Sequence, residues 1–116
     1  EAKSIESLED SYADAILDSA RPVWYRSSCP DDNQEWGWYG FVAEEIAEID
    51  PRLVSWSEKE EYNDEDGLPK LRDVETPEPE GVMYERFVPM LVNLVKRQKA
   101  AIETLETKVA ALEAAN

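Results

Sequence analysis

The chain has 116 residues, which is enough for one small domain or for a small domain with an appended helix. Its 27 acidic and 12 basic residues give a net charge of −15, and this argues against nucleic-acid or anionic-lipid partners, which are bound mainly through Lys and Arg. With one cysteine, Cys29, and no histidine, neither an internal disulfide nor a zinc site is possible. We therefore expect a reducing compartment, no metal, no cofactor and no membrane span, since no stretch reaches the eighteen or more apolar residues of a transmembrane helix.

The first quarter of the chain predicts a helix followed by a strand. Residues 4–20 place apolar side chains on one helical face, and Arg21-Pro22 ends the pattern; the apolar positions are Ile5, Leu8, Tyr12, Ile16 and Leu17. Residues 22–26 (PVWYR) are rich in aromatic and β-branched side chains, which is typical of a strand.

A polar loop at 27–34 leads into a second predicted strand at 35–42 (EWGWYGFV), which we expect to form a hairpin with the first. Gly37 and Gly40 indicate bulges or close approach of another group to the backbone. A short helix at 43–49 (AEEIAEI) ends at Asp50-Pro51, and residues 52–56 (RLVSW) predict a third strand.

Residues 57–80 differ in character from the rest of the chain. They contain ten acidic residues, three prolines and one glycine, and predict a long loop or protruding arm with a short strand at 71–74. A last short strand at 81–83 leads into the terminal helix.

The final segment, 84–116, predicts one helix with a seven-residue apolar repeat. Pro89 is compatible with this helix if the helix begins near Phe87 and predicts a kink if it begins at Tyr84. With heptad position a at Val88, the seam of a and d positions is Val88, Leu91, Val95, Gln98, Ile102, Leu105, Val109 and Leu112. A strict 3.5-residue period is the pattern of a left-handed coiled coil, so we expect the chain to oligomerise through this helix.

The predicted fold class is therefore α+β, with a projecting coiled coil. We expect a globular part at 1–83, with 57–80 as its acidic arm, and a coiled-coil helix at 84–116. The seam chemistry leaves the number of chains open, because β-branched residues at a with Leu at d favour two strands.

Three segments together resemble the C-terminal intramolecular chaperone domain of phage tail spikes, tail fibres and neck appendages. They are KSIESLEDSYADAILDSARPVWYR (3–26), GWYGFVAEEIAEIDPRLVSW (37–56) and VMYERFVPMLVNLVKRQKAAIETLETKVAALE (82–113). This endosialidase-type domain is also classed as a self-cleaving serine peptidase. The match covers nearly the whole chain in the same order and spacing, and each motif by itself is modest.

The resemblance implies a homotrimer, formed by three parallel terminal helices. It also implies that the domain holds the upstream fibre or spike of the same polypeptide in register during folding in the host cytoplasm. Cleavage just before the domain would then release it, so that it is absent from the mature virion.

In that family the cut is attributed to a serine in a Ser-Asp-x-x-x-Lys pattern, with the lysine as the base that activates a weak nucleophile. Lys3 lies close to the expected position of this lysine, but no Ser-Asp pair is present, and Ser4 follows Lys3 instead of preceding it. We expect that the nucleophilic serine lies upstream of Glu1 and that this chain as given cuts nothing.

Several motifs carry two interpretations. The turn at 63–67 (NDEDG) suggests calcium but lacks the ligand spacing of an EF-hand, so a solvated acidic turn is favoured. The short helix at 43–49 carries three glutamates, which form either an acid-base group or its solvent-exposed face: Glu44, Glu45 and Glu48. We favour the solvent-exposed face. The four tryptophans form a ligand platform or, as is more usual for strand residues, core or interface.

The resemblance thus implies an intramolecular chaperone and trimerisation domain. The alternative is a structural trimeric cap that remains in the virion and is never cleaved. An ordinary enzyme with a diffusible substrate is disfavoured, because the chain has no histidine, one cysteine and no phosphate-binding loop.

Overall fold

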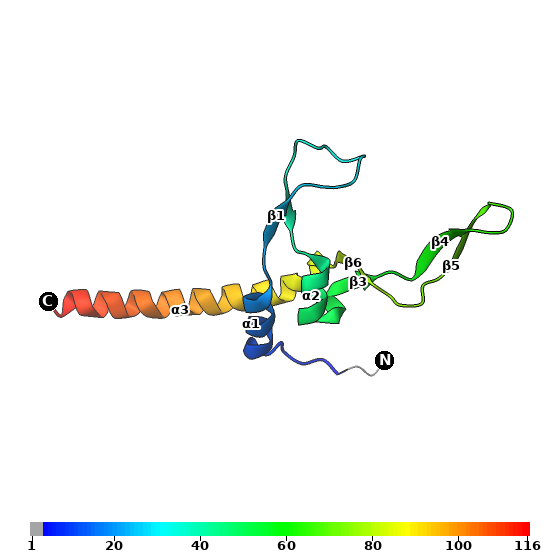
Figure 1. The fold of residues 1–116 in the computed structure, drawn as a ribbon. Helices are drawn as coiled ribbons and strands as arrows, with labels where there is room; N and C mark the ends of the chain where they lie inside the picture. Colours follow the sequence, from blue (N-terminus) through cyan, green and yellow to red (C-terminus); the bar gives the residue numbers. More distant parts are fainter. Residues whose placement is uncertain (1–3) are drawn as a thin grey trace. The chain divides into compact units, whose positions relative to one another are not determined.

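The computed structural model describes residues 4–116 and combines helices with short antiparallel strands, which confirms the predicted mixed class (Figure 1). The chain divides into two compact units. One joins the chain up to Asp18 with Glu85–Asn116, and the other is Ser19–Tyr84. None of the described helices is both long and apolar enough to cross a membrane.

In the first unit, helix α1 spans Asp10–Ser19, so it is shorter than the predicted segment 4–20. The backbone carbonyl of Glu9 accepts hydrogen bonds from the amides of Tyr12 and Ala13, at 3.1 and 3.2 Å, and so begins the helix. Ile5 and Leu8 precede this point and are exposed, so their predicted place on the helical face was wrong. The buried face of α1 consists of Ala13 and Ile16.

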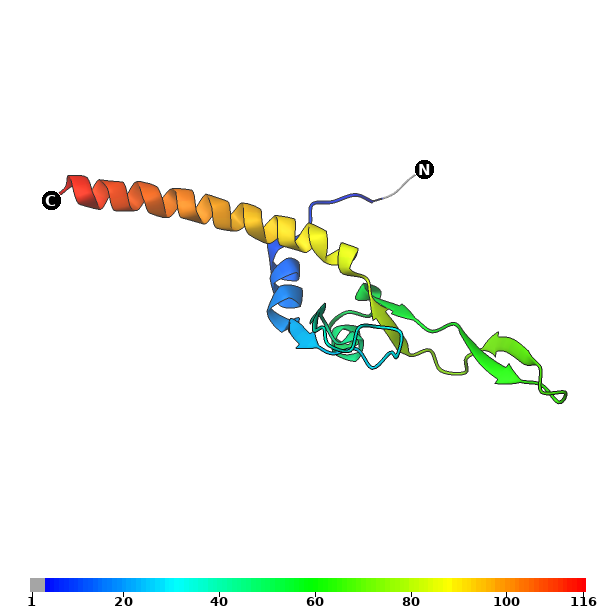
Figure 2. The same ribbon diagram turned by 90° about the horizontal axis from the view of Figure 1, so that it is seen from above.

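The terminal helix α3 spans Val88–Ala114 and is 27 residues long, preceded by a 3₁₀ turn at Tyr84–Phe87. Pro89 lies in the first turn of α3, where its missing amide leaves no intrahelical bond unmade. The prediction that Pro89 is compatible with a start near Phe87 is confirmed. Figures 1 and 2 show α3 as one continuous helix.

The second unit begins with a hairpin of strands β1 (Val23–Tyr25) and β2 (Trp38–Gly40), paired antiparallel with Trp24 opposite Tyr39. The predicted hairpin is confirmed, with shorter strands than expected. Both glycines lie under aromatic groups, as one of the two interpretations predicted. A Cβ atom on Gly37 would collide with the Trp24 indole, and one on Gly40 would collide with the Tyr84 hydroxyl.

Helix α2 (Ala43–Ile49) matches its predicted bounds and packs on strands β3 (Val54–Trp56) and β6 (Pro79–Val82), which pair antiparallel. The predicted third strand, 52–56, loses its first two residues to a 3₁₀ turn at Pro51–Leu53. Asp50 caps this turn, since its carboxylate accepts hydrogen bonds from the Arg52 amide at 2.9 Å and from the Arg52 guanidinium at 2.7 Å.

The acidic segment forms a β-hairpin of strands β4 (Lys59–Asn63) and β5 (Pro69–Asp73), where one short strand at 71–74 was predicted. Opposite charges face each other across it: Lys59 pairs with Asp73, and Arg72 with Glu60 at 2.8 Å. The turn is closed by Asp64, whose carboxylate accepts from the amides of Asp66 and Leu68, each at 2.9 Å. Gly67 follows with φ +77°, a backbone conformation that favours glycine.

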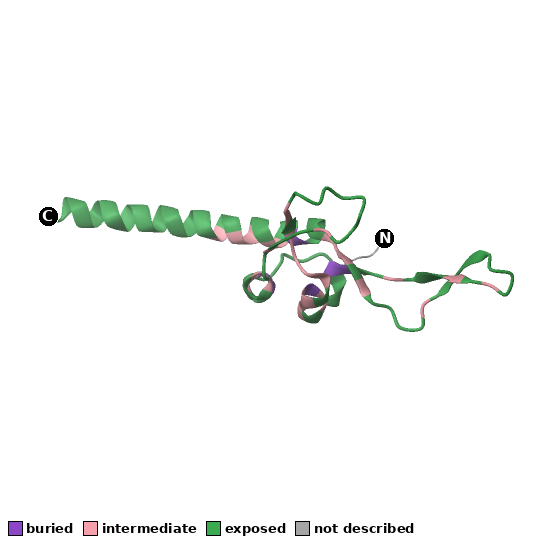
Figure 3. Ribbon diagram, turned by 45° about the horizontal axis from the view of Figure 1, so that its top comes forward, coloured by how far each residue is buried: buried purple, intermediate pink, exposed green. Residues whose placement is uncertain are grey.

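The buried core of the second unit is aliphatic: Ile46, Leu53 and Val54 (Figure 3). The tryptophans were expected in the core or at an interface, and in the single chain Trp24 and Trp36 do not belong to the core. Trp24 is 55% exposed, Trp36 59% and Tyr39 85%. A two-stranded hairpin has no second layer to cover its faces, so these rings stay in contact with solvent.

We predict that the capping carboxylate of Asp50 makes the stability of the second unit depend on pH. Hydrogen bonds from Arg52 lower the pKa of Asp50 in the folded state, so its contribution is complete above its unfolded pKa, near 4, and is lost as the pH falls through the lower folded value. Asp50→Asn should cost about 1 kcal/mol at pH 7. Urea unfolding followed by tryptophan fluorescence should show this difference shrinking below about pH 4.

The matched control is Glu45→Gln, which removes a carboxylate paired with Arg21 at an exposed position. It should change stability less, because exposed ion pairs are screened by solvent. A difference between Asp50→Asn and the native chain that stays constant from pH 7 to pH 3 would contradict the assignment.

Candidate oligomerisation seam

All eight predicted seam residues are exposed along α3, and Figure 3 colours most of this helix as exposed. Val95 is 60% exposed, Leu105 58% and Leu112 68%, and α3 contains no buried residue. A partner that binds the stripe would therefore displace only water from these apolar side chains. Burying apolar surface is favourable by about 25 cal/mol per Å², so a stripe of this length favours association.

The C-terminal part of the stripe is slightly hollowed. Ile102, Leu105 and Val109 line a shallow groove that is bordered by the carboxylates of Glu106 and Glu113. In heptad terms Lys108 is at g and Glu113 at the following e, so parallel copies of the helix bring opposite charges together across the seam.

The charge of α3 differs from that of the rest of the chain. The helix carries four cations and three carboxylates, which gives +1, whereas the whole chain carries −15. The remaining residues therefore carry −16. Repulsion between copies arises mostly outside α3, and the seam itself is nearly neutral.

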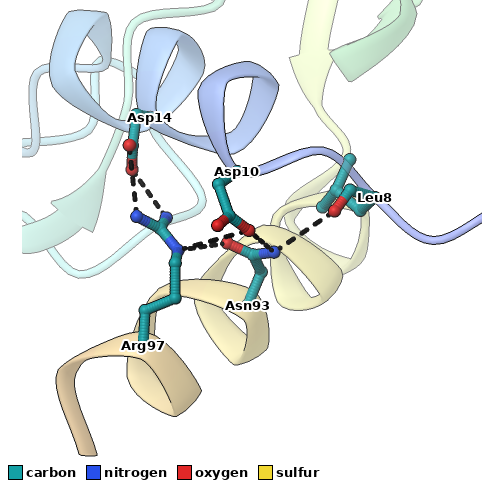
Figure 4. A network of polar contacts seen from close by, with 5 residues as sticks. All are labelled: Leu8, Asp10, Asp14, Asn93 and Arg97. Atoms are coloured by element: carbon teal, nitrogen blue, oxygen red, sulfur yellow. Dashed lines mark hydrogen bonds and ion pairs between the residues drawn. The ribbon is translucent and has the colours of Figure 1, made fainter. Parts of the chain in front are cut away.

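The opposite face of α3 is partly covered by α1. Asn93 and Arg97, at outer heptad positions f and c, reach the aspartates of α1 (Figure 4). Arg97 donates to both carboxylate oxygens of Asp14, at 2.6 and 3.2 Å, and its Nε donates to Oδ1 of Asn93 at 2.9 Å. The Asn93 amide in turn donates to Asp10 at 3.0 Å and to the backbone carbonyl of Leu8 at 3.4 Å.

These contacts form a connected polar network, which we call the α1 clamp: Leu8, Asp10, Asp14, Asn93 and Arg97. Its electrostatics centre on one cation. The hydrogen bonds to Asp14 raise the pKa of Arg97, and the charges of Asp14, Asp10 and Asp18 act in the same direction. Three aspartates spaced four residues apart repel one another on a helix, and Arg97 offsets that repulsion. The clamp therefore holds α1 on the outer face and leaves the seam open.

The heptad pattern predicts the seam, but nothing in the sequence analysis predicted the α1 clamp. The pattern that indicates it is present in the chain: Asp10, Asp14 and Asp18 share one face of α1, and Asn93 and Arg97 share the outer face of α3. Neither pattern alone names its partner, because the two lie more than 80 residues apart in the sequence.

The other candidate sites are not joined to the seam. Lys3, the proposed base, lies outside the described residues. In the acidic turn at 63–67, the Asp64 carboxylate accepts hydrogen bonds from backbone amides of the turn. Residues 4–116 contain no group of three or more acidic or cysteine side chains placed to hold a metal ion. Trp36 and Trp38 lie 5.8 Å apart between ring centroids, and Arg26 lies over the Trp24 ring at 5.6 Å.

We predict that Arg97→Met releases α1 from α3. Alone, a ten-residue helix is marginal in water, since isolated helices need more than about 12–15 residues, so α1 depends on its contacts. Hydrogen exchange should then accelerate several-fold in Asp10–Ser19 and change little in Val95–Ala114. Lys96→Met, at the neighbouring exposed position, is the control and should leave α1 protected. Equal protection of α1 in both variants would refute the clamp.

No protein-family model matches this chain, and a search of curated proteins finds no match either. Function is therefore inferred from the resemblance described above together with the chain's own features: the exposed seam, the nearly neutral charge of α3 and the clamp that keeps α1 on the outer face.

Proposed function

We propose that this chain is an intramolecular chaperone and trimerisation domain of a phage tail fibre or tail spike. The observation that carries the proposal is the seam of α3: seven apolar side chains at a and d positions, all exposed in the single chain, on a helix whose outer face is occupied by α1. The trimer and the viral context come from the resemblance described above, since the seam chemistry alone suits two or three strands.

The mechanism is preorganisation. Three chains joined along α3 hold their preceding segments at a high effective concentration, so a fibre that must intertwine begins folding with its strands already together. Joining the chains at one end removes most of the entropic cost of bringing them together later. Parallel helices also give all three preceding segments the same starting level, which an intertwined fibre requires.

We assign the β4–β5 hairpin as the arm that contacts the folding fibre. Its cations are engaged with its own carboxylates, as in the Arg72–Glu60 and Lys59–Asp73 pairs, and the arm is otherwise acidic. Leu68 and Leu71 are exposed on it, at 56% and 66%. A few apolar side chains among many carboxylates would hold a client weakly and let it go once its own core has formed.

After folding, release would follow from cleavage just upstream of the domain, with Lys3 as the base and a serine that precedes Glu1 as the nucleophile. The alternative is a cap that is never cleaved and stays in the virion. The intact mass of the mature fibre separates the two, because a retained cap adds the full 13.3 kDa to each chain.

We predict that the isolated domain is a trimer at micromolar concentration and that Leu105→Glu with Leu112→Glu makes it monomeric. An unpaired carboxylate inside an apolar layer is strongly unfavourable, so we expect the dissociation constant to rise by more than about 100-fold. Sedimentation equilibrium measures both states directly.

The matched control adds the same two charges at outer f positions, by Ala100→Glu with Thr107→Glu, and should remain trimeric. Native domain that sediments as a single copy at micromolar concentration would refute trimerisation through α3. Loss of the trimer in the control as well would show that charge, and not the seam, decides assembly.

We predict that neutralising the arm lowers the yield of correctly folded fibre from the full-length parent chain. The structure narrows the choice to Glu58, Glu61, Glu65 and Asp66, each changed to its amide, because Glu60 pairs with Arg72 and Asp64 closes the turn. Protease-resistant fibre should fall several-fold while expression stays constant.

The control for this experiment is Glu44→Gln with Glu48→Gln, which removes two exposed carboxylates from α2. Its fibre yield should match that of the native chain. An unchanged yield in the arm variant would remove the acidic side chains of the arm from the mechanism.

A further inference from the structure

Gln98 is the one polar side chain inside the seam. It occupies a d position, it is exposed, and it lies between Val95 and Ile102, with Leu91 and Leu105 in the d layers on either side. A primary amide has two donors and an acceptor with two lone pairs, so it must find polar partners when it is buried between helices.

Which partner Gln98 meets depends on how the copies align. In a parallel arrangement without offset, Gln98 meets Gln98 of the other copies. A shift of one heptad places it against Leu91 or Leu105. In a fully overlapping antiparallel pair, a positions face d positions, so Val88 faces Leu112, Val95 faces Leu105, and Gln98 faces Ile102.

Only the first of these alignments satisfies the amide. The other layers are Val, Leu or Ile throughout, and one such layer packs on another in any of the alignments, so they favour association without choosing a register. An amide buried against an aliphatic side chain loses its hydrogen bonds to water without replacement, which disfavours that alignment by about tenfold or more.

The α1 clamp links this layer to the rest of the first unit. Arg97 is the residue before Gln98, and it holds Asp14 of α1. The level of the Gln98 layer along α3 therefore also sets the level of α1 in each copy. A slip of one heptad would offset α1 of one copy from the others by about 10 Å along the axis, since the helix rises 1.5 Å per residue.

We propose that Gln98 is the register-setting residue of the seam: the amides of the associated copies meet in one layer and select the parallel, unshifted alignment. The occupant of the apolar stripe is a second and third copy of α3, which the complementary Lys108 and Glu113 positions also support. This inference rests on the proposed function, since it presumes assembly through α3.

The experiment compares Gln98 with Gln98→Leu in a chain that carries Cys29→Ser and Val109→Cys. The first change removes the native exposed thiol, and the second places a thiol at an a position. A disulfide needs Cα atoms within about 7 Å. A one-heptad slip separates the two introduced thiols by about 10 Å along the axis. In the antiparallel pair, position 109 of one copy faces Leu91 of the other, so the two thiols lie about 27 Å apart along the axis. A disulfide therefore forms only between two copies that lie parallel and unshifted.

With Gln98 we expect one stoichiometry and nearly complete disulfide formation between two of the three copies. With Gln98→Leu we expect a higher melting temperature, because an apolar layer replaces a polar one, together with several-fold slower or less complete cross-linking and a mixture of assembly sizes. Thr107→Leu adds the same side chain at an outer f position and should change neither readout.

Complete cross-linking and a single stoichiometry in Gln98→Leu would overturn the role of Gln98 while leaving assembly through α3 in place. An oligomer that does not cross-link with Gln98 present would also overturn it, because the preferred alignment would then be shifted or antiparallel. A monomeric native chain would overturn the proposed function itself, and this inference with it.

Discussion

The constraint on which the rest of the structure depends is the uncovered apolar stripe of α3. The 27-residue helix α3 has two different faces: one carries the seam, and the other carries the polar side chains that bind α1. A single chain covers only the outer face, near the start of the helix. The stripe therefore gains nothing from folding of one chain, and in the proposed assembly its burial would come from other copies of α3.

The distribution of charge opposes this association in one part of the molecule and permits it in another. The helix is close to neutral, while the remaining residues carry −16. Repulsion between copies is long-ranged and screened by salt, whereas burial of the seam is short-ranged and insensitive to it. In the proposed assembly, this division of charge would place most of the repulsion between copies outside the seam.

The second unit also buries few of its side chains. Its core consists of a few aliphatic residues under α2, and its two protruding hairpins consist of two strands each. A two-stranded hairpin alone is marginal in water, so local contacts must support it. In the β4–β5 hairpin these are cross-strand ion pairs and the Asp64 turn, and in the β1–β2 hairpin they are the Trp24 ring over Gly37 and the Tyr84 hydroxyl, which accepts from the Phe41 amide at 3.1 Å. Both hairpins leave aromatic or aliphatic side chains exposed.

The sequence by itself determined the features that depend on local periodicity: the mixed fold class, the bounds of α2, the first hairpin, and the tolerance of Pro89 at the start of α3. It misjudged α1, because Ile5 and Leu8 continue the helical pattern past the point where Glu9 begins the helix. Only the tertiary structure decided the pairing of β3 with β6, the second strand of the acidic hairpin, the exposure of the tryptophans and the α1 clamp. For the strand pairing and the clamp, the physical reason is that a hydrogen bond or ion pair between residues apart in the chain, such as Arg97 and Asp14, leaves no periodic trace, whereas a helix or its apolar stripe repeats within a few residues. For Trp24 and Trp36, the reason is that exposure depends on whether a second layer covers the hairpin.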